Sequence, residues 1–247
     1  MPRKIKITIE YEGGKYHGWQ VQPTGPTIQS VLQETLEQIT QKKTTVIGSG
    51  RTDAGVHAEA QVAHFVTDRS LTERQFLMAL NSLLPRDIVV TGVQEVGEDF
   101  HAQMSALKKI YRFTILNRLV PSALSYRRCW FMQFPLDVPA MRMAAQILVG
   151  EHDFSAFRAS NCEARNPVRK VLRIDIERQD DFIQFWIEGT GFLKHMVRNI
   201  VGTLVQVGRG RWDPEKVREI LDSGDRKQAG PTAQPQGLTL VQVFYPE

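Results

Sequence analysis

The sequence predicts an α+β fold of two ferredoxin-like (βαββαβ) units that form a continuous, mainly antiparallel sheet with helices on one face. The first 104 residues carry strand and helix periodicities in the order strand, helix, strand, strand, helix, strand, which is the split βαβ order. Residues 105–247 repeat this order loosely, without a letter-by-letter repeat. A chain of 247 residues is long enough for one large domain or for two domains of ordinary size. We therefore expect one unit at residues 1–104 and a second at residues 105–247.

The elements of the first unit follow from hydrophobic periodicity and from capping residues. Isoleucines at alternate positions predict the first strand, and apolar residues three and four apart predict two helices. Thr27 is the expected N-cap of the first helix, and Thr72 with Gln75 forms a capping-box pattern ahead of the second. The predicted strands cover residues 4–11, 44–47, 61–66 and 88–93, and the predicted helices cover residues 28–41 and 76–84.

The second unit is predicted in the same way, with one irregular stretch at residues 119–135. Its long helix is apolar nearly all round, so we expect it to be largely buried. The predicted strands cover residues 106–117, 168–178, 182–188 and 238–244, and the predicted helices cover residues 138–149, 192–207 and 214–221.

Composition indicates a globular protein that could bind a polyanion. Apolar residues make up 42% and charged residues 23% of the chain, and its formal net charge is +4. The two cysteines, Cys129 and Cys162, lie far apart, which argues against a zinc site or a disulfide framework and for a reducing compartment. Neither a signal-peptide core nor an apolar run of about 20 residues is present. We therefore expect a cytoplasmic protein without a metal site or membrane contact.

The stretch GSGRTDAGVHA, residues 48–58, is the first candidate for a functional site. It joins two predicted strands but is longer than a hairpin requires, and its glycines indicate unusual backbone conformations or a close approach by a ligand. Asp53 either hydrogen-bonds its own loop backbone, as Asp in turns usually does, or acts as a nucleophile or general base. A nearby cation such as Arg51 would keep it ionised.

Two familiar motifs are excluded at this loop. It lacks the last glycine of GxGxxG and the Gly-Lys-Ser/Thr of a P-loop. His57 and Glu59 match the H-x-E start of a zinc nucleobase deaminase, but the required P-C-x-x-C is absent. The loop therefore predicts neither a phosphate cradle nor a metal centre.

Two basic stretches are candidates in the second unit. Lys109, Tyr111 and Arg112 alternate basic and aromatic character, which is typical of a strand facing nucleic acid, although a strand tyrosine more often packs in a core. Lys194 and Arg198 are spaced one helical turn apart with no acid to pair them. Either they extend to solvent or they meet an anion from elsewhere, for which a catalytic Asp and an RNA phosphate are the candidates.

Several separated motifs together resemble the tRNA pseudouridine synthase A family. They are YEGG at 11–14, GWQ at 18–20, GRTDAGVHA at 50–58, KIYRF at 109–113, HDFSAF at 152–157, FLKHMVRNIVG at 192–202, AGPTA at 229–233 and GL at 237–238. They occur in order along essentially the whole chain. One small departure is Gln234, which stands between Ala233 and Pro235 where the family often has Ala-Pro directly.

The resemblance implies conversion of uridine to pseudouridine at positions 38, 39 and 40 of the tRNA anticodon stem-loop, by a homodimer without a cofactor. Asp53 would be the nucleophile, Arg198 would pair with it, and Arg51 would help to hold the uridine out of the stack. Tyr111 would contact the target base in a central RNA-binding cleft. The other expected substrate-binding residues are Lys109, Arg112 and Lys194.

Two other function classes remain open from the residues alone. The chain could be a non-catalytic RNA-binding or folding protein that uses the same basic sheet face, or a hydrolase of nucleosides with Asp53 as nucleophile. For the synthase itself, the carboxylate could add to the base, add to the ribose or assist abstraction of a sugar proton.

Overall fold

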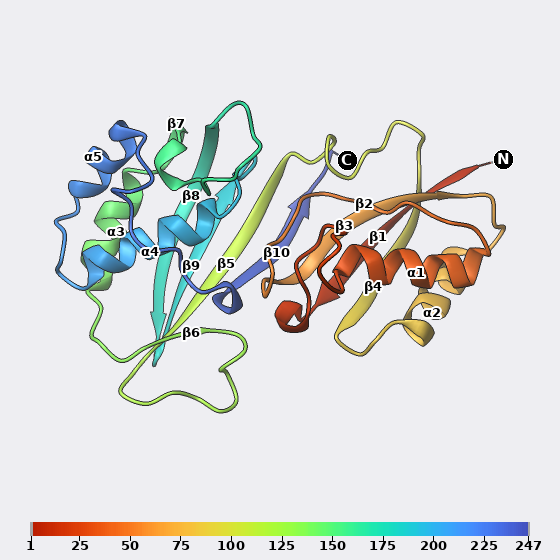
Figure 1. Ribbon diagram of the computed structural model, residues 1–247, viewed down its shortest axis with the longest axis horizontal. Coiled ribbons are helices and arrows are strands. Elements are labelled where there is room, and N and C mark those ends of the chain that lie inside the picture. The colour runs from red at the N-terminus through yellow and green to blue at the C-terminus, as the bar shows by residue number, and fades with distance from the viewer. Residues whose placement is uncertain (1, 247) are drawn as a thin grey trace. The chain divides into compact units, whose positions relative to one another are not determined.

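The computed structural model describes residues 2–246, and the chain divides into two compact units (Figure 1). Unit 1 comprises Met1–Leu107 and Leu240–Glu247, and unit 2 comprises Lys108–Thr239. Within the described residues there are five α-helices, and the strands pair mainly antiparallel, so the predicted α+β class is confirmed. None of the helices described is long and apolar enough to cross a membrane.

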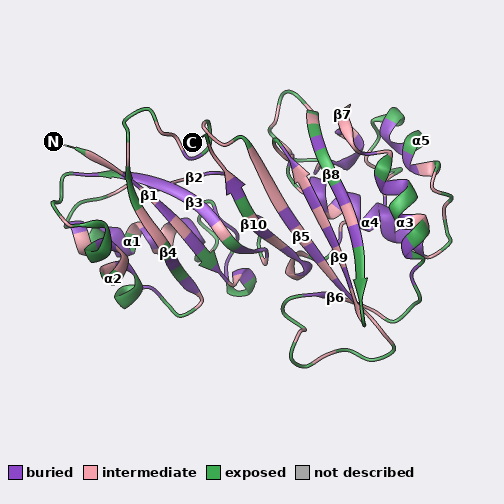
Figure 2. Cartoon of the chain, turned by 180° about the vertical axis from the view of Figure 1, so that it is seen from behind, coloured by how far each residue is buried: buried purple, intermediate pink, exposed green. Residues whose placement is uncertain are grey.

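Unit 1 has the strand order of a split βαβ unit. β4 pairs with β1, β1 with β3 and β3 with the short β2, all antiparallel. Helices α1 and α2 cover one face of this sheet (Figures 1 and 2), and β3 is buried along most of its length. The strands are β1 (Arg3–Tyr11), β2 (Ile47–Gly48), β3 (His57–Thr67) and β4 (Ile88–Val96), and the helices are α1 (Ile28–Thr40) and α2 (Glu73–Leu83).

Both predicted caps of unit 1 are confirmed, whereas several strand boundaries differ, most of all the start of β3. Thr27 and Ser30 cap each other's backbone N–H at the start of α1, and Thr72 and Gln75 do the same for α2. β3 begins at His57, four residues before the predicted start, because Tyr11 at the end of β1 pairs with Ala58 and so extends the ladder.

The sheet of unit 2 has the strand order β5-β9-β8-β7, all paired antiparallel, with β6 parallel beside β5. Helices α3 and α4 lie on one face of it (Figure 2). The strands are β5 (Lys108–Asn117), β6 (Trp130–Met132), β7 (Gly150–Asp153), β8 (Val168–Gln179) and β9 (Phe182–Gly189), and the helices are α3 (Val138–Gln146), α4 (Met196–Gly208) and α5 (Lys216–Ser223). β10 (Leu238–Phe244) follows, and from Leu240 onward it belongs to unit 1.

Helix α4 is largely buried, as its apolar sequence predicts, but its predicted start at residue 192 is wrong. The helix begins at Met196 because His195 adopts the left-handed conformation (φ 63°), which an α-helix cannot contain. Lys194 therefore precedes the helix and does not share a helical face with Arg198. This conformation at a histidine has no signature in hydrophobic periodicity.

Candidate active site

The loop between β2 and β3 carries Asp53 and Arg51. Asp53 is half-buried and Arg51 is exposed, while Thr52 between them is only 7% exposed. The N–H of Val56 donates to the Asp53 carbonyl (3.1 Å), and Gly55 has a φ of 80°. Residues 53–56 therefore form a tight turn with the aspartate at its start.

Thr52 is anchored twice, by the last residue of β1 and by the segment that follows β1. Its side-chain oxygen shares a hydrogen bond with the Tyr11 hydroxyl (2.8 Å), and its carbonyl accepts one from the Trp19 N–H (3.0 Å). Gly18 makes the approach possible, because its φ is +84° and a Cβ there would lie 2.6 Å from the Thr52 carbonyl oxygen. The loop is thus fixed one residue before Asp53.

The first part of the loop is held from β3. The Ser49 hydroxyl donates to Gln61 Oε1 (2.6 Å), and Gln61 Nε2 donates to the carbonyl of Gly50 (3.0 Å). Gly48 packs against the indole of Trp19, where a Cβ would lie 2.5 Å from ring carbons. The glycine at 48 is therefore needed by the protein's own packing.

His57 supports the far end of the loop. It is buried at the start of β3, and its Nδ1 accepts a hydrogen bond from the Gly13 N–H (3.1 Å). A carboxylate oxygen of Glu12 lies 3.7 Å from the same nitrogen. Gly13 lies so close to the loop that a Cβ would be 1.9 Å from the Val56 carbonyl oxygen.

In the described part of the chain, no cluster of three or more His, Cys, Asp and Glu residues could hold a metal ion.

The candidate residues of strand β5 lie on two different faces of the sheet. Tyr111 is 8% exposed and packs edge-to-face on Phe192 (ring centroids 5.2 Å apart). Lys109, two residues earlier, shares its face, and burial lowers the pKa of the Lys109 ammonium to about 8. Arg112 falls on the opposite face, where its guanidinium lies 5.3 Å from the Trp186 ring centroid. Lys109 and Tyr111 are therefore neighbours, and Arg112 is separate from both.

Arg198 lies in the first turn of α4 and is held by the segment before β10. Its Nε donates to the Ala233 carbonyl (2.8 Å), and the Ala233 N–H donates back to the Arg198 carbonyl (3.1 Å). Lys194 is exposed in the turn before the helix, and its carbonyl accepts from the Ala159 N–H (2.9 Å).

A buried polar cluster that the sequence did not single out as functional fixes residues 229–233 on α4. Asn199 Oδ1 accepts from Arg226 Nη2 (3.0 Å) and from the Thr232 hydroxyl (2.7 Å), and the Thr203 hydroxyl accepts from the Gly230 N–H (2.9 Å). The sequence signals are the AGPTA motif itself and the motif at 192–202, which contains Asn199. This cluster holds the segment that in turn holds Arg198.

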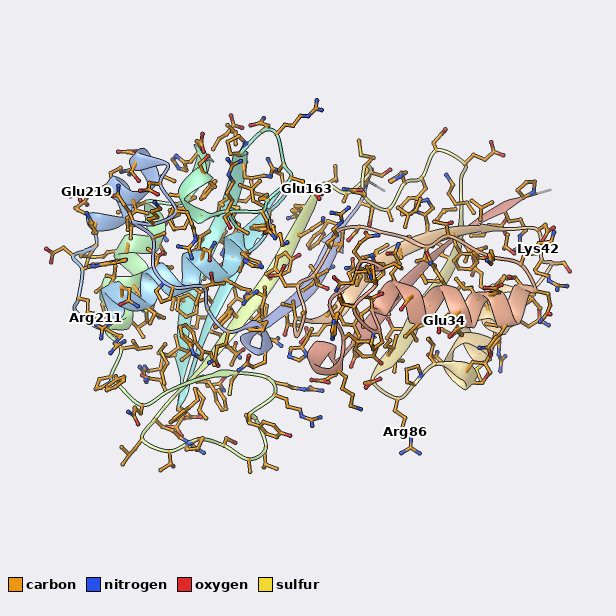
Figure 3. All side chains as sticks on the ribbon, viewed as in Figure 1. Glu34, Lys42, Arg86, Glu163, Arg211 and Glu219 are labelled. Carbon is orange, nitrogen blue, oxygen red and sulfur yellow. The ribbon has the colours of Figure 1, made fainter. Side chains whose placement is uncertain are left out.

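The candidate residues are thus distributed over both units. Unit 1 holds Arg51 and Asp53 in one loop, and unit 2 holds Lys109 with Tyr111 on one strand face and Arg198 on a helix. Further basic side chains, among them Lys42 and Arg86, extend from the surface of unit 1 (Figure 3). They belong to other segments than the loop.

The comparisons with known proteins decide the family. A family model described as tRNA pseudouridine synthase matches residues 7–104 and 144–246. A tRNA pseudouridine synthase A of Myxococcus xanthus is 51% identical over 246 residues, covering 99% of this chain and 92% of that protein. One from Geobacter sp. (strain M21) is 49% identical over 246 residues, covering 99% of this chain and 100% of that protein.

The chain belongs to the tRNA pseudouridine synthase A family. The family predicted from the motifs is therefore confirmed, and with it the predicted enzyme class, an isomerase. Among solved structures, a chain in the crystal structure of a Cbf5-Nop10-Gar1 complex aligns with 96% of this chain and 48% of its own length, at 14% identity and a TM-score of 0.40.

Proposed function

We propose that this tRNA pseudouridine synthase isomerises uridine at positions 38, 39 and 40 of the tRNA anticodon stem-loop, with Asp53 as the nucleophile. The observation that carries the proposal is a half-buried aspartate at the start of a tight turn whose preceding residues are anchored on both sides. A loop that served only to connect two strands would not need the buried Thr52, the buried Ser49–Gln61 hydrogen bond and the close approach of Gly18. Rigid placement of a reactive group is what covalent catalysis requires.

The other residues take roles that match their chemistry. Tyr111 contacts the target base, and Arg198 pairs with the carboxylate of Asp53. Arg51, which is exposed, helps to hold the uridine outside the helical stack. The expected phosphate contacts are Lys109, Arg112 and Lys194. Arg112 lies on the other sheet face from Lys109, so it contacts a different part of the RNA.

The arrangement of the whole enzyme is part of the same proposal. Each of the two units is ferredoxin-like, and the enzyme works as a cytoplasmic homodimer. Because stem uridines are paired and stacked, flipping one out costs a few kcal/mol, which contacts to tRNA phosphates offset.

The decisive experiment is incubation of the protein with unmodified tRNA, followed by mapping of pseudouridine. We expect the modification at positions 38–40, its complete loss in Asp53→Asn, and retention of most tRNA affinity in that variant. Asp68→Asn is the matched control, because Asp68 is an exposed carboxylate of unit 1 that pairs with Lys42 outside the loop. Pseudouridine formation by Asp53→Asn at the unaltered rate would overturn the assignment of the nucleophile.

The same incubation separates the other two function classes. A hydrolase would release free uracil and leave an abasic ribose, whereas an isomerase releases no base. A non-catalytic RNA-binding protein would leave the tRNA composition unchanged and would make Asp53→Asn silent.

A further inference from the structure

The hydroxyl of Tyr11 is buried in unit 1 and shares a hydrogen bond with the equally buried side chain of Thr52, one residue before Asp53. We propose that Tyr11 is a positioning residue for the reaction, which holds the Asp53 carboxylate in its reactive place through Thr52. The inference rests on the proposed role of Asp53 and adds a residue that does not touch the substrate.

The first step of the argument is the rigidity of the support. Tyr11 ends β1, which is paired on both sides, with Ala58 of β3 opposite on one side and Ile88 of β4 on the other. Its ring also packs beside that of Trp19, with centroids 6.3 Å apart. The hydroxyl therefore projects from a side chain that the sheet and an aromatic neighbour keep in place.

The second step is that the backbone and the side chain of Thr52 are fixed by the same segment. The Trp19 N–H holds the Thr52 carbonyl, and the Trp19 carbonyl in turn accepts from the N–H of Gln29 in α1 (3.0 Å). The Gly18 carbonyl likewise accepts from the Ile28 N–H (3.1 Å). Helix α1, strand β1 and the catalytic loop thus meet at residues 18 and 19.

The third step is that Asp53 has little freedom once Thr52 is fixed. A Cβ on Gly18 would lie 3.1 Å from the Asp53 carbonyl carbon, so the backbone of the aspartate passes directly over Gly18. After it, the bond from the Val56 N–H closes the turn. The Tyr11–Thr52 bond is a side-chain contact that ties the start of this turn to β1.

The hydroxyl acts as a hydrogen-bond partner and not as a proton donor in the reaction. Burial raises the pKa of the Tyr11 phenol to about 12, although its hydrogen bonds to Thr52 and Gln61 oppose the rise, so it stays neutral at physiological pH. A buried hydroxyl that loses its partner must find another or remain unsatisfied. Without Tyr11 the Thr52 side chain would reorient, and Asp53 would move with it.

The test compares two tyrosine-to-phenylalanine changes. Tyr11→Phe keeps the ring and removes the hydroxyl beside the loop. Tyr16→Phe removes the hydroxyl of another tyrosine of unit 1, which donates to Asp87 (2.6 Å) away from the loop. We expect kcat on tRNA to fall about 10- to 100-fold in Tyr11→Phe, as for a displaced catalytic group, with KM and tRNA affinity unchanged. Tyr16→Phe should keep its kcat.

Thr52 provides the second pair of variants. This pair tests whether the Tyr11–Thr52 hydrogen bond positions Asp53 even if Tyr11→Phe does not fold. Thr52→Ser keeps the hydroxyl and should retain most of the kcat, whereas Thr52→Val keeps the shape and should lose as much as Tyr11→Phe. In the double variant Tyr11→Phe/Thr52→Val the losses should not multiply, because both changes break the same bond. Multiplying losses would overturn the proposed coupling.

Asp53→Asn measured alongside keeps the two proposals apart. If Asp53→Asn is inactive while Tyr11→Phe and Thr52→Val have unaltered kcat, the positioning role of Tyr11 is wrong and the role of Asp53 stands. If Asp53→Asn turns over normally, the nucleophile assignment is wrong and the positioning role fails with it. A fall in kcat that is equal in Tyr11→Phe and Tyr16→Phe would also overturn the inference, because it would reflect lost stability.

Discussion

Arg198 and Ala233 hydrogen-bond each other in both directions, from the guanidinium Nε to the Ala233 carbonyl and from the Ala233 N–H to the Arg198 carbonyl. The first bond fixes the plane of the guanidinium, because Nε lies in that plane. The second holds residues 229–233 against the first turn of α4. The orientation of Arg198 therefore depends on a segment 35 residues further along the chain.

Arg198→Lys should lose most of its turnover while remaining folded. Lysine keeps the charge, but it has neither the Nε donor nor the planar fork that pairs with a carboxylate in two places. We expect kcat to fall by about two orders of magnitude, the loss typical of one removed catalytic electrostatic contact, and the free energy of unfolding to change by about 1 kcal/mol.

Arg142→Lys is the matched control for this change. Arg142 in α3 also donates its Nε to a backbone carbonyl, that of Ile176 (2.7 Å), but it is not a candidate site residue. Turnover and urea unfolding of both variants check the prediction. If Arg198→Lys instead unfolds while Arg142→Lys does not, the main role of Arg198 is structural.

Gly202→Ala should strongly destabilise unit 2. A Cβ at Gly202 would lie 1.7 Å from the Pro231 carbonyl oxygen, so residues 229–233 would have to move away from α4. That movement would break the bonds of Asn199 and Thr203 to this segment, and we expect a loss of several kcal/mol of unfolding free energy. Thermal denaturation checks it, with Gly97→Ala as the control because nothing lies within 4 Å of a Cβ there. Equal melting temperatures for the two variants would contradict the prediction.

Most elements of this fold and the loop that carries Asp53 could be predicted from local sequence patterns, because periodicity and caps act within a few residues; the short strands β6 and β7 are not among the predicted elements. The contacts that hold the site residues in place could not be predicted in this way. Gly48 suggested a ligand approach, yet it packs on Trp19, which is 29 positions away in the sequence. Asn199 gives no sign that it binds Arg226 and Thr232. Such pairs depend on how distant segments meet, and no local pattern records that.

The interpretation of Lys194 shows a different limit. Its spacing from Arg198 predicts one shared helical face, but that holds only if every residue between them is helical. His195 is not, and a single positive φ moves Lys194 off the helix. Apolar periodicity averages over a whole segment, so it cannot detect one residue that leaves the regular conformation.

His64 should make the stability of unit 1 depend on acid. It is buried on β3, where desolvation, His101 and Lys4 lower its pKa to about 4, and its Nδ1 accepts from the Ala102 N–H (3.1 Å). Between the ordinary histidine value of about 6.5 and pH 4, the unfolded chain binds a proton that the folded chain does not. Stability is therefore complete above about pH 6.5 and falls as the pH drops towards 4.

The measurement is urea unfolding at several values between pH 7 and 4.5. In His64→Gln, part of this pH dependence should disappear, up to about 1.4 kcal/mol per pH unit for the one proton. His17→Gln is the control, because His17 is exposed in the same unit. An unchanged slope in His64→Gln would show that other groups cause the acid sensitivity.

Lys109 should make tRNA binding weaken as the pH rises through about 8. Its ammonium has a pKa lowered to about 8 by burial beside Tyr111, so above this value the group loses its charge and its attraction for a phosphate. Arginine remains charged throughout this range, so Lys109→Arg should bind tRNA equally at pH 7 and pH 9. Lys109→Met should bind weakly at both values, and its unfolding free energy at pH 7 should rise because burial disfavours the charged form. Filter binding at fixed salt checks the affinities. If the tRNA affinity of Lys109→Arg falls between pH 7 and 9 as steeply as that of the unaltered protein, the pH dependence belongs to another group.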